Sequence, residues 1–465
     1  MDLRGGPGRR LRLGVLAEVF TPELVDAVIA EHGRGERRRR ILPARLVVYF
    51  VLALCLFARE SYEEVVRLLA TGLPGTTALR RVNKSSLCRA RARLGPEPLE
   101  SLFRSIAGTL ATPETPGAFW RGLRLLALDG TQIDIPDSHS NATTFDGPCL
   151  QDRTPTGFPQ VRAVVLAEVG THAVVDAEIG GWRDGEPGLA VPLARSVGPD
   201  TLVIADRGFW SSAFYRDFHA VRGAHLLARL PSNKLGRKRH DLPDGTFISE
   251  IRPNKQRMLR AKKEGQPFPK EMVFRVIPFA VDGKPWWLAT TLLDPKQHPA
   301  VELINLYRQR WEVEMAFDEI KNHLGVSGPL RSRTADGIRQ EVWAFLAVHH
   351  ALRKVMHTAA TSGPAVDPDR VSYLAAVRVI RRTVVAQVAT TAVSLQHALV
   401  EVCEELRHRL LPARRRREQP RMVKKPPSRF PQKRSRSGMT KAEVGRWHGS
   451  KKPRSARPAP TGAPG

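Results

Sequence analysis

The stretch YRQRWEVEMAFDEIK, residues 307–321, decides the fold of this chain of 465 residues. Four residues of this stretch are separated by three, four and seven positions: Tyr307, Arg310, Glu314 and Lys321. In an α-helix these four positions share one face. A face with a tyrosine, an arginine, a glutamate and a lysine fits a metal-binding glutamate flanked by cations that bind phosphates. A solvated face with ion pairs is the alternative.

Two aspartates earlier in the chain each follow a short apolar strand and precede a turn. Residues 123–128 are an apolar run ending at Asp129, and residues 201–205 are another ending at Asp206. The carboxyl ends of buried strands are where α/β sheets build sites. Phosphodiester cleavage with two divalent metals needs a few converging carboxylates, because Mg²⁺ prefers oxygen ligands. Each aspartate alone also fits an ordinary turn or cap residue.

These residues together resemble a known family. The spacing Tyr307-x2-Arg310-x3-Glu314-x6-Lys321 resembles the YREK signature of the IS4-type family of bacterial insertion-sequence transposases. The boxes Asp129-Gly130-Thr131 and Asp206-Arg207-Gly208-Phe209 are similar to the family's two aspartate boxes, and residues 86–95 resemble part of its N-terminal domain. The resemblance covers most of the chain and weakens only after about residue 435.

The resemblance implies an α/β fold: an RNase H-like catalytic core with a β-rich insertion, preceded by a helical N-terminal DNA-binding domain. It carries over the catalytic metal ligands as Asp129, Asp206 and Glu314, with Mg²⁺ as the ion and Mn²⁺ as a substitute. It carries over the contacts to the DNA end as Tyr307, Arg310 and Lys321. Periodicity alone does not choose Glu314 over the neighbouring acids, and only the resemblance does so; the rival ligands are Asp134, Asp137, Glu312, Asp318 and Glu319.

In hairpin-forming relatives a tryptophan of the insertion receives a flipped base, which offsets the cost of unstacking. Trp286 or Trp287 matches that role by its place in the chain. A core position in a strand is the alternative for either one.

Changes in composition and hydrophobic pattern along the sequence divide the chain into six segments. Residues 1–111 repeat apolar positions at helical spacing, a Thr/Pro/Gly linker follows, and the chain then turns to strands. The first three expected segments are a helical DNA-binding domain (1–111), the first part of the catalytic core (119–230) and a β-rich insertion (231–284). The second part of the core (285–362) follows and contains the Glu helix, expected over 301–323. The last two segments are a C-terminal helical segment (363–411) and a basic tail with no stable fold of its own (412–465).

The charge of the chain favours nucleic acid as a partner. Lys and Arg number 74 against 46 acids, a net charge of +28, and more than half of it lies after residue 413. Such a tail is expected to act as an electrostatic arm on phosphates, or as a basic terminus with no dedicated role. Arg89 and Arg93 share one face of an expected basic helix that suits DNA. A solvated surface helix is the alternative.

No membrane partner is expected. The longest apolar run, residues 46–57, is shorter than the ~20 residues that cross a bilayer. It predicts a buried helix. The four cysteines form no CxxC pair and fit reduced thiols in a cytoplasmic, nucleoid-associated bacterial protein.

The sequence therefore predicts a DDE-type transposase. It would bind the terminal repeats of its element, cleave them, and join the 3′-OH ends to target DNA, with a hairpin intermediate as an option. A homodimer follows from the family's need to pair two ends. Two alternatives remain: an RNase H-like nuclease that cuts without strand transfer, and a catalytically silent DNA-binding derivative.

Overall fold

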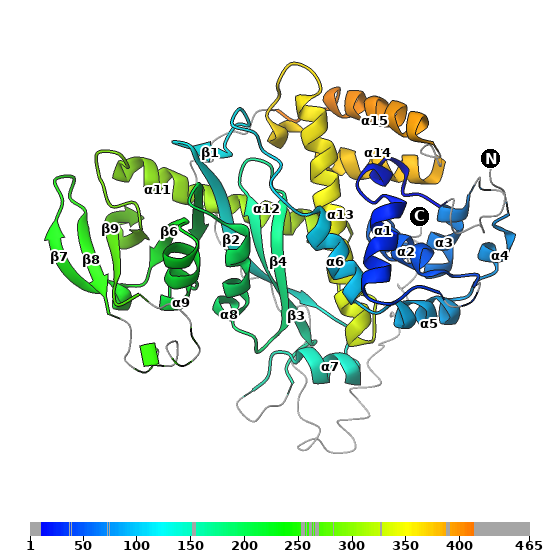
Figure 1. Cartoon of the computed structure of the whole chain (residues 1–465), viewed down its shortest axis with the longest axis horizontal. Helices are drawn as coiled ribbons and strands as arrows, with labels where there is room; N and C mark the ends of the chain where they lie inside the picture. The colour runs from blue at the N-terminus through cyan, green and yellow to red at the C-terminus, as the bar shows by residue number, and fades with distance from the viewer. Residues whose placement is uncertain are drawn as a thin grey trace, which may run out of the picture.

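A mixed sheet of ten strands runs through the protein in the computed structural model (Figure 1). The model describes residues 11–412, except 37, 39, 72, 74, 151–154, 253–255, 257, 260–262, 264, 266–268, 282, 326–327 and 387–390. The tail expected over 412–465 lies outside the described residues from position 413 onward. The strands are β1 (Phe119–Trp120), β2 (Leu123–Asp134), β3 (Gln160–Glu168), β4 (Val174–Gly181), β5 (Thr201–Ala205), β6 (His225–Leu230), β7 (Arg237–Asp241), β8 (Phe247–Ile251), β9 (Met272–Val281) and β10 (Lys284–Thr290).

The first half of the sheet has the expected core topology. The order is β4-β3-β2-β5-β6, with β2, β3 and β4 as an antiparallel meander and β5 and β6 parallel to β2. This is the strand order of an RNase H-like core, and it confirms the expected fold.

Alternating residues of the central strands explain why this sheet is covered on both faces. In β2, Leu125 and Ala127 belong to one apolar cluster, whereas Leu126 and Leu128 belong to a second cluster. Successive side chains of a strand point to opposite faces, so the continuous apolar runs require cover on both sides.

The strands after Pro231 extend the same sheet. The order continues β6-β10-β9-β8-β7, all antiparallel, so β10 pairs with the core strand β6. The fully buried Arg275 of β9 fixes this extension, donating to Thr246 at 2.9 Å and to the carbonyl of His298 at 2.6 Å. The β-rich region is therefore continuous with the catalytic sheet.

The N-terminal segment is helical, as the apolar periodicity predicts. Its helices are α1 (Pro22–Glu31), α2 (Ala44–Leu56), α3 (Tyr62–Ala70), α4 (Thr77–Arg80), α5 (Lys84–Leu94) and α6 (Glu97–Ile106). Helix α2 is buried along nearly its whole length, as the apolar run predicts. None of the helices in the described part of the chain is long and apolar enough to cross a membrane.

A long helix joins the N-terminal helices to the sheet. Helix α13 (Ala335–Thr361) packs against α2 and α6 and also against β4 (Figure 1). The remaining helices are α7 (His139–Phe145), α8 (Glu186–Ala190), α9 (Ser212–Phe214), α11 (Ala300–Arg308), α12 (Glu312–Asp318), α14 (Tyr373–Ala386) and α15 (Ala392–Arg407).

The helix expected over 301–323 forms, but two stretches of it are not α-helical. Helix α11 passes through a 3₁₀ turn at Gln309–Trp311 into α12, which continues as a π-helical turn at Glu319–His323. Such irregular turns inside a helix often mark functional positions. Arg310 lies in the first of these turns, and Glu314 lies in the α-helix that follows it.

Candidate active site

The two aspartates lie next to each other across the parallel strands β2 and β5. The last residue pair of these strands is Leu128 with Ala205, and Asp129 and Asp206 follow directly. Asp206 comes after the end of β5, as expected. Asp129 differs from the expectation, because β2 does not end there: it continues to pair with β3, where Asp129 lies opposite Val165. The antiparallel partner holds the aspartate on a rigid strand.

Side chains of the Glu helix reach both aspartates. Arg310 donates to Oδ2 of Asp129 at 2.7 Å and to Oε1 of Glu314 at 3.5 Å. The hydroxyl of Tyr307 donates to Oδ1 of Asp206 at 3.3 Å. Helix α12 itself packs on β2 and β3. The structure therefore gathers Asp129, Asp206 and Glu314 around the Tyr and Arg of the same helix face.

The cluster is electrostatically crowded. Burial raises the pKa of Asp129, Arg310 opposes this, and the charge of Asp206 raises the pKa further. Burial also raises the pKa of Glu314. Arg310 opposes this shift, and the charges of the two aspartates raise the pKa of Glu314 further. Burial and Asp206 together raise the pKa of Tyr307 to about 12. Three acids held in this way favour a bound cation, because added positive charge stabilises their ionised forms.

A cavity of about 570 Å³ opens beside the cluster. Lys321 lines it from the Glu helix, and Thr131 and Asp134 line it from β2. Burial lowers the pKa of Lys321, while Asp134 opposes that shift. The cavity falls within the usual size of ligand sites, about 300–1,000 Å³. Tyr307 and Arg310 thus contact the two aspartates, whereas Lys321 lies in the cavity next to Gly130.

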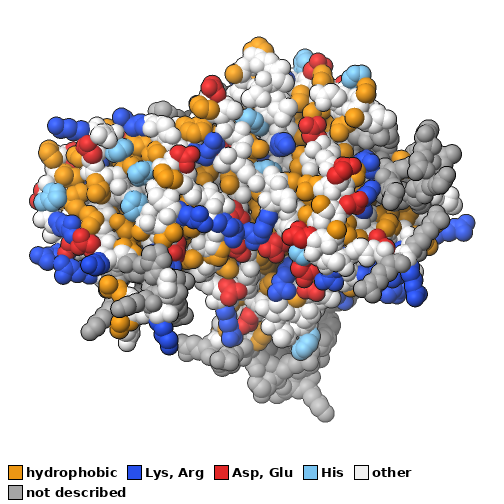
Figure 2. Space-filling model, viewed as in Figure 1, with side chains coloured by type: hydrophobic (Ala, Val, Ile, Leu, Met, Phe, Trp, Pro, Cys, Tyr) orange, Lys and Arg blue, Asp and Glu red, His pale blue; other side chains and the backbone are white. Residues whose placement is uncertain are grey.

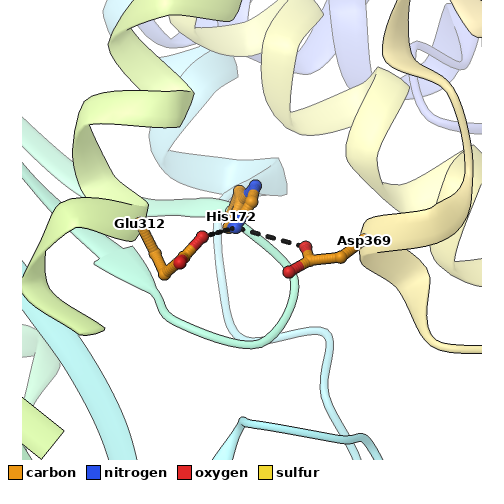
Figure 3. A group of neighbouring side chains, drawn as sticks. All are labelled: His172, Glu312 and Asp369. Atoms are coloured by element: carbon orange, nitrogen blue, oxygen red, sulfur yellow. Dashed lines mark hydrogen bonds and ion pairs between the residues drawn. The ribbon is translucent and has the colours of Figure 1, made fainter. Parts of the chain in front are cut away.

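The rival acid Glu312 points to a different place (Figure 3). It accepts from Nε2 of His172 at 2.8 Å, and Asp369 lies 3.2 Å from the same nitrogen. Arg353 donates to Nδ1 of His172 at 2.7 Å. Arginine has no acceptor, so Nδ1 must accept and the ring hydrogen must be on Nε2. Glu312 therefore belongs to a hydrogen-bonded network around His172.

Glu319 belongs to the same network and is buried. Arg353 donates to it through Nε at 3.0 Å, and His349 lies 2.9 Å from its carboxylate. Burial alone would raise the pKa of Glu319, but Arg353 and His349 outweigh it and lower the pKa to about 2. The other rivals also have partners: Asp318 accepts from Asn322, and Asp134 accepts from Gln160. Asp137 has a partner as well.

The donor chemistry decides which group fits a divalent metal. Among the described residues, one group of possible metal ligands has its ligand atoms within 4.8 Å of one another: His172, Glu312 and Asp369. The hydrogen on Nε2 of that histidine, however, occupies the lone-pair position that a metal would need. Asp129, Asp206 and Glu314 offer only carboxylate oxygens, the donors that Mg²⁺ and Mn²⁺ prefer. The carboxylate group is the better fit.

Comparison with known families identifies the chain. The model of the transposase DDE domain matches residues 120–349, and the model of the insertion element 4 transposase N-terminal domain matches residues 10–104. The chain belongs to the IS4 family of DDE transposases. A transposase of this family acts on DNA and uses divalent metal, and this chain is accordingly a transposase.

Two curated relatives of this IS4-family transposase come from Escherichia coli (strain K12). The transposase InsG for insertion sequence element IS4 is 27% identical over 419 residues, covering 90% of this chain and 93% of InsG. InsZ is 26% identical over 197 residues, covering 42% of this chain and 64% of InsZ. Among solved structures, the cryo-EM structure of the piggyBac transposase synaptic complex with hairpin DNA has a TM-score of 0.42 and 12% identity, covering 86% of this chain and 84% of that one.

The expected DNA-binding arginines of the N-terminal domain are exposed on α5. Arg89 donates to the hydroxyls of Ser85 and Ser86, and Arg93 lies one turn further along. Arg91, between them, faces inward and binds the buried Glu341 of α13. The same helix therefore anchors itself through one arginine and presents two others. Lys and Arg side chains gather at both ends of the view in Figure 2 and across its middle.

The two tryptophans of β10 differ in their surroundings. The guanidinium of Arg229 lies over the ring of Trp286, 3.4 Å from its centroid, and Phe279 contacts that ring edge-on. Trp287 packs against an apolar cluster of the sheet. Arg229 also acts electrostatically on Tyr307, so Trp286 is connected to the site through Arg229. Trp287 matches the core alternative.

Sequence reasoning missed two residues of this site. Trp311 is 59% exposed, and the guanidinium of Arg310 lies 5.8 Å from the centroid of its ring. Its position inside the signature was the available signal. Glu186 of α8 lines the cavity beside Gly130. No sequence signal marks Glu186, because it lies far from the signature in a Gly- and Pro-rich stretch.

Proposed function

We propose that this IS4-family transposase cleaves the ends of its element with two Mg²⁺ ions, for which Mn²⁺ substitutes, and joins the freed 3′-OH to target DNA. Asp129, Asp206 and Glu314 are the metal ligands in this proposal. The observation that carries it is the ion pairing of Arg310 with both Asp129 and Glu314, beside Asp206. It supports one site built from two strands and one helix.

The chemistry divides between the metals and the protein. The metals would supply positive charge to the attacking and leaving oxygens of the phosphodiester. In this proposal Arg310 and Lys321 bind phosphates of the DNA end. Water attacks the phosphorus, the bond to the 3′ oxygen breaks, and a 3′-OH remains. That hydroxyl then attacks target DNA by the same displacement.

A hairpin intermediate is part of the proposal. The freed 3′-OH attacks the opposite strand, and water reopens the hairpin. Folding a strand back in this way requires a base to leave the stack, and an aromatic ring offsets that cost. Trp286 is the better candidate of the two β10 tryptophans, because Trp287 packs on the core.

The remaining parts of the chain bind and pair the DNA ends in this proposal. Arg89 and Arg93 contact the backbone of the terminal repeat from residues 1–111, and the tail from residue 412 adds electrostatic attraction. The proposed domains also include the two parts of the catalytic core (119–230 and 285–362), the insertion between them (231–284) and the C-terminal helical segment (363–411). Pairing two ends requires a homodimer, and chromosomal DNA places the protein at the bacterial nucleoid in the cytoplasm.

Cleavage of labelled element ends with Mg²⁺ tests the proposal. Asp129→Ala, Asp206→Ala and Glu314→Ala are each expected to abolish cleavage while leaving end binding in place. Normal cleavage by Glu314→Ala together with loss in Glu312→Ala would overturn the ligand assignment. A plasmid target added to the wild type separates the alternatives: joined products indicate a transposase, cleavage alone a nuclease, and neither a silent DNA-binding derivative.

A further inference from the structure

The carboxylate of Glu186 lies against the backbone next to Asp129. Helix α8 begins at Glu186 and packs on β3 and β4, on the same sheet that carries the site. A methyl group added at Gly130 would come within 2.8 Å of both Cδ and Oε1 of Glu186. The absence of a side chain at Gly130 therefore makes room for this carboxylate.

Glu186 has no polar partner of its own among the described residues. It is half-buried, and it takes part in no hydrogen bond or ion pair with the rest of the described chain. Arg162 is the opposing charge that acts on Glu186, but its guanidinium donates to the carbonyl of Asp184 at 2.7 Å and lies over the ring of Trp182. The carboxylate of Glu186 borders the open cavity, so its oxygens can bind an ion there without giving up a partner in the described part of the protein.

The surroundings of Glu186 connect it to the catalytic acids. Burial raises the pKa of Glu186, Arg162 opposes this, and the charges of Asp129 and Asp206 raise the pKa further. The same residue lines the cavity that Lys321 and Thr131 border. The carboxylate thus lies against the backbone of Gly130, next to Asp129, and borders the cavity there.

We propose that Glu186 is a fourth carboxylate of the catalytic metal site, which binds the divalent ion held by Asp129 directly or through its water. The proposal rests on the proposed function, in which Asp129, Asp206 and Glu314 hold the metals. Gly130 acquires a specific role: it allows the fourth carboxylate to approach. Glu186 would add negative charge and an oxygen donor on the side of the site opposite the Glu helix.

Binding of Mn²⁺ to the full chain without DNA tests this proposal, with free Mn²⁺ measured by electron paramagnetic resonance. Glu186→Gln is expected to raise the Kd for Mn²⁺ about tenfold, as is typical when a residue that supports a metal ligand is lost. Glu401→Gln, which removes the same charge from an exposed position of α15, is the matched control and should bind Mn²⁺ like the wild type.

Asp129→Asn separates this proposal from the proposed function. If Asp129→Asn weakens Mn²⁺ binding and Glu186→Gln does not, Glu186 is outside the metal site and the inference is wrong. If neither variant changes the Kd, the ligand assignment of the proposed function fails as well. Thermal unfolding of Glu186→Gln without metal should occur at or above the temperature of the wild type, because the change removes a carboxylate that burial and Asp129 disfavour. A tenfold rise in Kd then reports on the site and not on misfolding.

Discussion

The guanidinium of Arg310 donates to the carboxylate of Asp129 at 2.7 Å, which joins the Glu helix to the central strand of the sheet. The two residues are 181 positions apart in the chain. The same arginine reaches Glu314, so a single cation neutralises acids from two different elements. This contact holds together two of the three acids to which the function is ascribed, and Tyr307 of the same helix reaches the third, Asp206.

Removal of this arginine should destabilise the protein most when metal is absent. Arg310→Ala leaves Asp129 and Glu314 close together without a counter-charge. Loss of charged hydrogen bonds at a half-buried position costs about 2 kcal/mol in the free energy of unfolding. Urea unfolding with and without Mg²⁺ measures this change in the free energy of unfolding, and Mg²⁺ should restore part of the lost stability. Arg308→Ala, at an exposed position of the same helix, is the control and should change little. Equal losses in the two variants would contradict the account.

Arg353 should be far more important for stability than its neighbour on α13. It pairs with the buried Glu319, and removing one partner of a buried ion pair costs about 3–5 kcal/mol. Arg353→Ala should show that loss at neutral pH by chemical unfolding, whereas the exposed Lys354→Ala should not. A loss below about 1 kcal/mol would show that the network does not hold the Glu helix.

The same pair predicts how stability depends on acid. The pKa of Glu319 is lowered in the folded protein to about 2, from an ordinary value of 4.5. Its ionised form therefore stabilises the fold above pH 4.5, and this stabilisation is lost as the pH falls towards 2. Glu319→Gln should show a shallower loss of stability over this range than the wild type. The free energy of unfolding measured at several pH values checks this prediction. Parallel plots of stability against pH for the variant and the wild type would contradict the lowered pKa of Glu319.

Gly130→Ala should act on metal binding through Glu186. The added methyl group would displace the end of a flexible side chain, so the fold should persist. We expect Gly130→Ala to raise the Kd for Mn²⁺ as much as Glu186→Gln does. In the double variant the two effects should not add, since both remove the same carboxylate from the site. Additive effects would mean that the two residues act separately.

Truncation after Leu411 should weaken DNA binding most at low salt. The removed segment carries more than half of the net charge, and each phosphate contact adds to the salt dependence of binding. A fluorescence titration of an element end at several salt concentrations should give a less steep slope for the truncated protein. Identical affinity and slope would show that the tail makes no contact with DNA.

The sequence predicted the core well because its signals are local and periodic. The apolar runs before Asp129 and Asp206 predicted β2 and β5, and the three-, four- and seven-residue steps predicted the face of the Glu helix. The choice of Glu314 over Glu312 needed the family resemblance. In the structure Glu312 contacts His172 from the β3–β4 turn, a contact across 140 positions that periodicity cannot show.

Other features depended on distant contacts that leave no pattern in the sequence. The continuation of β2 past Asp129 depends on pairing with β3, and the extension of the sheet beyond β6 depends on β10. Glu186 reaches the site because α8 packs back over the sheet. The different surroundings of Trp286 and Trp287 likewise follow from strand pairing, because adjacent residues of a strand face opposite sides.

Anomalous scattering from crystals grown with Mn²⁺ tests the central claim most directly. The account predicts peaks between the carboxylates of Asp129, Asp206 and Glu314, with Glu186 beside them. A peak at His172, Glu312 and Asp369, with none at the three acids, would contradict it.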